Sequence, residues 1–223
     1  MRLNIPLLLL FTLVFAATGN AQSVSIRIGT LGPGIHFSLP VSSSLSIRAG
    51  GSYFAYSHSE TAGDEDVDVD FRGDLEWGGA TLLADWFPFR SGFRLTGGAF
   101  YNLISVTGTG VPTKPYYLNE GQISEKIFQP DRLGTLSANL TYGSKLNPYA
   151  GIGFGDGARG AHVSFLADFG VIYVGSPEIE MQGTGMIAGT ASQDEMLTTG
   201  LKSFQWLPVV SVGLALRIGK TVE

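Results

Sequence analysis

The chain has 223 residues, enough for one domain or one closed barrel, so a second domain would have to be very small. It contains no cysteine, which excludes disulfides and thiolate metal sites, and its net charge of -5 without a Lys/Arg cluster argues against nucleic acid as a partner. Only 15% of the residues are charged, whereas 31 glycines and 14 phenylalanines favour strands and tight turns over helices.

Residues 1–21 have the pattern of a secretory signal peptide. Arg2 supplies the positive start, residues 5–17 are almost unbroken apolar, and residues 19–21 place small side chains where signal peptidase inspects the chain. The apolar run falls short of the ~20 residues that a spanning helix needs. We therefore expect cleavage after residue 21 and a mature domain of residues 22–223.

Alternation of apolar with small or polar residues, typical of transmembrane strands, recurs along the mature chain. No mature stretch is long and apolar enough for a spanning helix, so strands would have to cross a membrane. The alternating segments are 45–55, 78–87 with less regularity, 93–103, 136–154, 163–173 and 205–218.

The first mature segment, residues 24–39, leaves two alternatives open. Its apolar positions change parity at residues 30–34, where Gly32, Pro33 and Gly34 favour a turn. Two short strands joined there would bring the total to eight, whereas a bulge in one strand would leave seven. Bacterial barrels have an even number of strands, which favours eight for the whole chain.

Short and long connections alternate along the chain. The short turns are 40–44, 88–92 and 156–160, and the long polar segments are 57–74, 107–134 and 176–203. Bacterial outer-membrane barrels have short periplasmic turns and long outer loops. The pattern therefore predicts that the three long segments are loops facing outward.

With this leader, these strands and glycine-aromatic strand ends such as residues 149–155, the chain resembles the small outer-membrane β-barrel proteins of the OmpA-like transmembrane kind. The resemblance covers residues 22–219. It implies an all-β, antiparallel, up-and-down transmembrane β-barrel of eight strands, in the outer membrane of a Gram-negative bacterium. It also implies a monomer that contacts outer-membrane lipids and lipopolysaccharide and is assembled by the barrel-assembly machinery. In that family the last strand usually ends the chain with an aromatic residue, whereas here Ile218 stands in that place and five residues follow.

Several charged residues lie on the strand faces that are expected to point inward. Opposite charges removed from bulk water must pair, so we expect a salt-bridge cluster that fills the lumen; a selectivity ring for small ions is the alternative. The predicted interior charge cluster, with His36 nearby, consists of Arg48, Asp85, Arg94, Asp168 and Arg217.

An acidic stretch occupies the first long segment. Alternate carboxylates at Asp66, Asp68 and Asp70 have the chemistry of a divalent-cation site, but the glycine and terminal glutamate of a calcium loop are missing at the required spacing. A solvated acidic loop is the favoured interpretation, and no metal site or cofactor is expected. The stretch consists of Glu60, Asp64, Glu65, Asp66, Asp68, Asp70, Asp74 and Glu76.

An enzymatic function has only a weak sequence signal. Residues 162–164, His-Val-Ser, resemble the His-x-Ser element of outer-membrane lipid A deacylases, but they follow a short turn and so belong near the periplasm. His58, Ser59 and Glu60 lie at the outer end, yet consecutive residues on a strand point to opposite sides. We therefore expect no catalytic residue.

The aromatic residues are interpreted as girdles at the two membrane interfaces: Trp77, Trp86, Trp206, Tyr53, Tyr101 and Tyr173. Together these patterns predict a non-enzymatic outer-membrane barrel protein with three long surface loops that serves envelope integrity or surface interaction. A narrow passive pore and a lipid A modifying enzyme are the alternatives.

Overall fold

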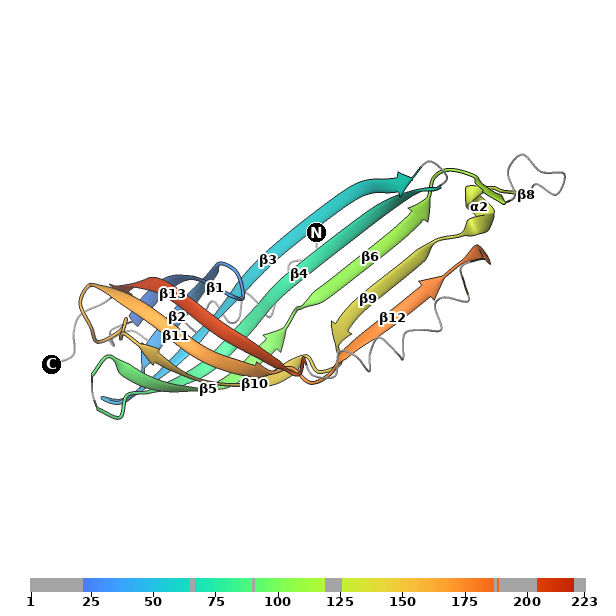
Figure 1. Ribbon diagram of the computed structural model, residues 1–223. Helices are drawn as coiled ribbons and strands as arrows, with labels where there is room; N and C mark the ends of the chain where they lie inside the picture. Colours follow the sequence, from blue (N-terminus) through green and yellow to red (C-terminus); the bar gives the residue numbers. More distant parts are fainter. Residues whose placement is uncertain are drawn as a thin grey trace, which may run out of the picture.

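The structure is a computed structural model that describes residues 22–64, 67–89, 91–118, 126–186, 188 and 204–218. The expected signal peptide lies outside these residues. A barrel occupies one end of the molecule, and a sheet projects from it (Figure 1). In the described parts of the chain, no helix has the length and hydrophobicity to cross a membrane.

Eight strands pair in an antiparallel ring that forms the barrel. The ring runs in the order β1, β2, β3, β4, β5, β10, β11 and β13, and β13 pairs with β1 to complete it. The expected antiparallel barrel fold is therefore confirmed. The strands are β1 (Gln22–Gly29), β2 (Gly34–Pro40), β3 (Leu45–Asp64), β4 (Val67–Trp86), β5 (Phe93–Asn102), β10 (Leu146–Phe154), β11 (Val163–Tyr173) and β13 (Trp206–Ile218).

The change of parity at residues 30–34 is a turn between two strands. β1 ends at Gly29 and β2 begins at Gly34, and the two pair with each other. Gly32 has a φ of +87°, a backbone conformation that favours glycine, and a Cβ there would lie 2.9 Å from the Cβ of Phe54. The two-strand alternative is thus the one adopted.

Five strands continue beyond the barrel as a sheet, which we call the extension sheet. The far halves of β3 and β4 are followed in it by β6 (Ser105–Pro112), β9 (Leu136–Tyr142) and β12 (Pro177–Gly183). A small hairpin of β7 (Tyr116–Leu118) and β8 (Lys126–Phe128) and the one-turn helix α2 (Pro130–Leu133) lie near its tip (Figure 1).

The extension sheet corrects the prediction of three long loops. Where described, much of the three polar segments is strand: β3 and β4 pair over twenty residues each, and β6 and β12 fall in the other two segments. The expected long strand at 136–154 is two strands, because β9 joins the extension sheet and β10 joins the ring. The chain therefore has more than eight strands, although eight make up the ring.

In the barrel, the strands direct apolar side chains outward and polar ones inward. Along β1, Ile26 and Ile28 are exposed, whereas Ser23, Ser25 and Arg27 are buried. A continuous apolar outer surface of this kind is what a lipid-facing barrel requires. Other exposed side chains of this surface are Ile35, Leu82, Trp86, Tyr101, Ile152, Phe154, Phe165, Phe169, Val212 and Leu214.

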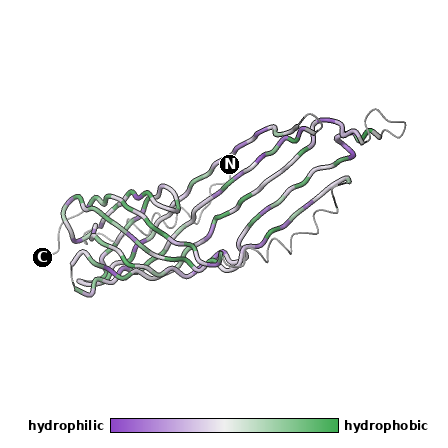
Figure 2. Tube along the Cα trace, viewed as in Figure 1, coloured by the Kyte–Doolittle hydropathy of each residue, from purple (hydrophilic) through white to green (hydrophobic). Residues whose placement is uncertain are grey.

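In the extension sheet the same two faces exchange their chemistry. The face continuous with the lumen, which we call the concave face, carries apolar residues such as Val69 and Phe71 of β4. The face continuous with the barrel's outer surface, which we call the convex face, carries Asp70, Arg72 and Asp74. Hydrophilic positions are accordingly interspersed along the extension strands (Figure 2). An outer face that carries charged side chains is suited to contact with water. The apolar, lipid-facing surface therefore ends where the ring ends.

Candidate functional site

Two aspartates and three arginines form a buried ionic network inside the barrel, which we call the lumen network. It consists of Arg27, Arg48, Asp85, Arg94 and Asp168, one residue each from five strands of the ring. Each of these side chains has at most 6% of its surface exposed. Charges buried to this extent depend on one another for stabilisation.

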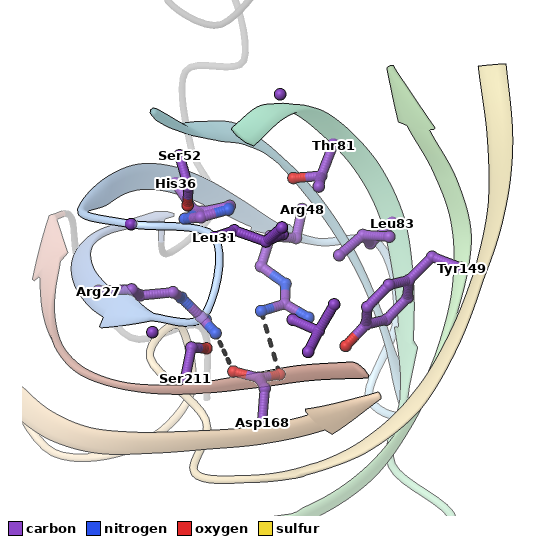
Figure 3. Close-up of a pocket in the computed structure, with 14 residues that line it drawn as sticks. Arg27, Leu31, His36, Arg48, Ser52, Thr81, Leu83, Tyr149, Asp168 and Ser211 are labelled. Atoms are coloured by element: carbon purple, nitrogen blue, oxygen red, sulfur yellow. Dashed lines mark hydrogen bonds and ion pairs between the residues drawn. The ribbon is translucent and has the colours of Figure 1, made fainter. Parts of the chain in front are cut away.

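Asp168 is the centre of the network. Its Oδ1 accepts hydrogen bonds from Arg48 Nη1 at 3.2 Å and Arg94 Nη2 at 2.7 Å, and its Oδ2 accepts one from Arg27 Nη1. The guanidinium groups of Arg27 and Arg48 both point at this carboxylate (Figure 3). One carboxylate thus joins three strands across the lumen.

Asp85 is the second acceptor. Its Oδ1 receives Arg48 Nη2 at 3.0 Å and the hydroxyl of Thr96 at 2.6 Å, and Arg94 Nε lies 3.5 Å away. Arg48 therefore bridges the two aspartates. Each acceptor bond comes from a charged or hydroxyl donor, which is the arrangement that compensates the loss of water around a buried carboxylate.

A glycine makes room for one of these bonds. Arg94 pairs with Gly153, and Gly153 pairs with Asp168 on the next strand, so the arginine reaches its partner across the glycine. A Cβ at Gly153 would lie 2.8 Å from Arg94 Cζ. The absence of a side chain at this position is what allows the guanidinium to cross.

The structure brings together Arg48, Asp85, Arg94 and Asp168 of the predicted cluster, but not Arg217. Asp168 is level with Ser211 on β13, and Arg217 lies six residues further along that strand, which is about 20 Å. Arg217 is half-buried at the barrel end, where its Nη1 donates to the carbonyl of Gly160 at 2.9 Å. It therefore holds a turn instead of joining the network.

Arg27 belongs to the network but was not among the predicted residues. The sequence does carry a signal for it, since Arg27 stands between Ile26 and Ile28 on a strand whose even positions face outward. His36 is also buried, and it lines a small cavity beside Arg27 and Arg48. The predicted proximity of His36 to the charges is thus observed.

The space around the lumen network is small. A cavity of about 40 Å³ lies on one side of it, bordered by Leu31, His36 and Thr81, and one of about 10 Å³ lies on the other, bordered by Phe87 and Asp156. One water needs roughly 10–15 Å³ by this measure, so the two spaces suit a few waters and no larger solute.

The turn between β10 and β11 closes the barrel end that carries the short turns. Arg159 donates to the carbonyls of Ser42 and Leu45 at 2.6 and 2.7 Å, and its guanidinium lies 4.9 Å from the ring centroid of Phe87. Ala158 beside it is only 1% exposed. The turn therefore folds into the barrel mouth.

An apolar cluster fills the lumen at the other end, where the extension sheet begins. Its members come from both the barrel and the extension sheet: Leu31, Leu83, Phe100, Ile104, Tyr142, Tyr149, Ile172, Val174 and Val209. Trp77 packs against the cluster and donates its indole N–H to the carbonyl of Thr30 at 2.8 Å. Trp77 is thus directed inward and is not part of an aromatic girdle, in contrast to the expectation.

The other girdle residues are exposed on the outside. Tyr173 and Trp206 pack with ring centroids 4.8 Å apart, and Tyr53 and Tyr101 are also exposed. Trp86 lies on the outer surface at the opposite end of the ring, opposite Leu45. Exposed aromatic side chains therefore lie at both ends of the apolar surface.

The acidic stretch is distributed along strands. Asp68 pairs with Lys114 at 2.7 Å, Asp70 accepts the hydroxyl of Thr61, and Asp74 accepts that of Ser57. Each of these three carboxylates thus has a separate partner. Glu65 and Asp66 lie outside the described residues.

The two candidate catalytic elements lie at opposite ends of the molecule. Ser164 donates to the carbonyl of Ala161 at 3.2 Å, next to His162 at the barrel end with the short turns. His58 Nε2 lies 3.7 Å from Glu60 on the concave side of the extension sheet, and both side chains are largely exposed.

Comparison with known proteins places the fold. No protein-family model and no curated protein matches the sequence. The structure is similar to that of Acinetobacter baumannii CarO2, with 18% identity, a TM-score of 0.54, and coverage of 89% of this chain and 99% of that one. It is also similar to Acinetobacter baumannii CarO, with 17% identity, a TM-score of 0.51, and coverage of 87% and 96%. A major outer membrane protein from Thermus thermophilus matches at 14% identity and a TM-score of 0.41, over 90% and 100%.

The ring of eight strands, its apolar outer surface and the similarity to the two CarO structures define the class: the chain has the fold of the outer-membrane β-barrel proteins.

Proposed function

We propose that this chain is a non-enzymatic outer-membrane protein whose barrel does not conduct, and whose extension sheet stands outside the cell for surface interaction. The observation that carries the proposal is the filled lumen, with the lumen network between a folded-in turn and an apolar cluster. A barrel of eight strands has an interior just wide enough for its own side chains. The barrel then serves as the membrane anchor, and the extension sheet serves for surface interaction.

The proposed location, assembly and orientation of the protein rest on the same features. We propose a monomer of the small OmpA-like kind, exported by the leader, assembled by the barrel-assembly machinery and surrounded by outer-membrane lipid and lipopolysaccharide. The short turns face the periplasm. The polar convex face of the extension sheet supports this orientation, because it suits water outside the bilayer.

Conductance in planar bilayers tests the proposal. The purified protein, with insertion verified by resistance to protease, should leave the current at the level of the lipid alone. Stable unitary steps would establish the narrow-pore alternative. In a separate arm, a change in lipid A mass on expression would establish the enzyme alternative, and we expect none.

A further inference from the structure

A trench runs across the strands on the concave face of the extension sheet. Gly73 of β4 pairs with Gly108 of β6, and Gly108 pairs with Ala138 of β9, so three residues without bulk form one row. Among the residues that the structure describes, a Cβ added at Gly73 or Gly108 would meet no heavy atom within 4 Å. The described part of the chain therefore leaves the space in front of this row open.

Bulky residues border the row on both sides. The row nearer the barrel consists of Leu75, Val106 and Leu140. The row nearer the tip consists of Phe71, Gly110 and Leu136, and the ring of Phe71 lies beside Gly110, where a Cβ would be 3.4 Å from Phe71 Cε1. The two bulky rows are four residues apart along each strand, or about 13 Å between Cα atoms. The row of Gly73, Gly108 and Ala138 therefore forms the floor of the trench between these two rows.

The trench is part of a pocket of about 660 Å³. Tyr116 of β7 and Leu133 of α2 border it from outside the sheet. Its lining is almost wholly apolar, since Arg72 and Thr109 belong to the convex face, where Arg72 pairs with Asp74. A charged ligand would lose its hydration against this lining. The ionisable side chains beside it on the same face, His58 level with Gly73 and Glu60 level with Phe71, lie outside the pocket lining and pair with each other at 3.7 Å.

We propose that the trench binds one uncharged, flat, largely aromatic molecule, with its plane against the peptide groups of Gly73 and Gly108. Pockets of roughly 300–1,000 Å³ bury most of a small organic ligand, and this one falls within that range. A trench floor without side chains allows a flat ring to contact the peptide groups directly. The apolar rows on both sides favour a ligand without charge. The inference rests on the proposed function in one respect, that the extension sheet stands in water.

The uncharged dye N-phenyl-1-naphthylamine provides the probe. With Trp86→Phe and Trp206→Phe, Trp77 is the remaining tryptophan, and it lies on the same strand face four residues from Gly73, about 13 Å away. In lipid nanodiscs, after subtraction of empty discs, we expect saturable energy transfer from Trp77 to the dye. Transfer that rises only with lipid content, or none at all, would overturn the proposal.

Two leucine substitutions of glycine localise the site. Gly108→Leu fills the trench without a backbone clash and should weaken dye binding at least tenfold. Gly97→Leu is the matched control, because Gly97 lies on the outer face of the barrel, where a Cβ would lie 4.0 Å from Tyr149 O, and binding should be unchanged. Equal affinity in Gly108→Leu and the parent would reject this site.

Self-association gives a different result. If the parent is a dimer that binds no dye, and Gly108→Leu is a monomer, a second copy covers the trench and the proposal fails. Conductance by the barrel would instead reject the proposed function while leaving saturable dye binding intact. The two failures are therefore distinguishable.

Discussion

Asp168 accepts hydrogen bonds from arginines on three strands, so its removal would leave three buried guanidinium groups with fewer partners. Breaking a buried ion pair by deleting one member costs about 3–5 kcal/mol. We expect Asp168→Ala to lower the free energy of unfolding by that amount, measured by urea titration of tryptophan fluorescence in lipid vesicles. Asp85→Ala should have a similar effect, because its partners are equally buried.

Asp70→Ala is the control for these variants. Asp70 is exposed on the convex face, where water and salt screen its charge, so the loss should be about 0–1 kcal/mol. If Asp168→Ala were as mild as Asp70→Ala, the lumen would be hydrated and the filled-barrel argument would fail.

Gly153 has an equally specific role, since Arg94 crosses it to reach Asp168. Gly153→Leu should displace the guanidinium and cost about 1–3 kcal/mol from overpacking, measured by the same titration. Gly97→Leu, on the outer face of the barrel, should be close to neutral. A neutral Gly153→Leu would show that Arg94 has another route to its partner.

Residue alternation predicted most of the lumen network but not its extent. Arg48, Asp85, Arg94 and Asp168 were identified because each lies on the inward parity of a recognisable strand. Arg217 also has the inward-facing parity. Parity specifies the face of the strand but not the position along the barrel axis, and Arg217 is level with Ser23. The position of a residue along the barrel axis depends on the register between strands that are distant in sequence. A single sequence does not specify this register.

At the scale of elements, the extension sheet shows that the composition of a segment is a poor predictor of whether the segment forms a strand. The segment 57–74 is polar enough to predict a loop, yet Val69 and Phe71 alternate there with Asp70 and Arg72. That is the alternation of a strand with one face in water. The exchange of chemistry between the two faces of β4 conceals this strand, because the alternation of a transmembrane strand places polar residues inside and apolar residues outside.

The same exchange predicts which elements are accessible from outside the cell. The chain has no cysteine, so single substitutions give clean labelling sites. Ser59→Cys, on the convex face of β3, should react with a membrane-impermeant maleimide on whole cells. Ser43→Cys, in a short turn, should react only after lysis. The reverse pattern would invert the orientation of the barrel.

At the scale of the whole molecule, a complete ring of hydrogen-bonded strands should resist detergent. The mature protein should fractionate with outer membranes and migrate faster on SDS gels when unheated than after boiling, because the ring stays compact until heat separates its strands. Equal mobility before and after boiling, or recovery as a soluble periplasmic protein, would contradict the barrel.

The pairing of β1 with β13 also determines the order in which this chain can fold. β3 and β4 are close in sequence, so their hairpin forms at low entropic cost, whereas residues 22–29 must find residues 211–218. Until β13 arrives, β1 presents an unpaired edge that is prone to pair with another chain. Arg27 of β1 reaches Asp168 of β11 across β13, so this bond forms only when the seam closes. The last step of assembly is therefore also the step that brings the third arginine to the buried aspartate.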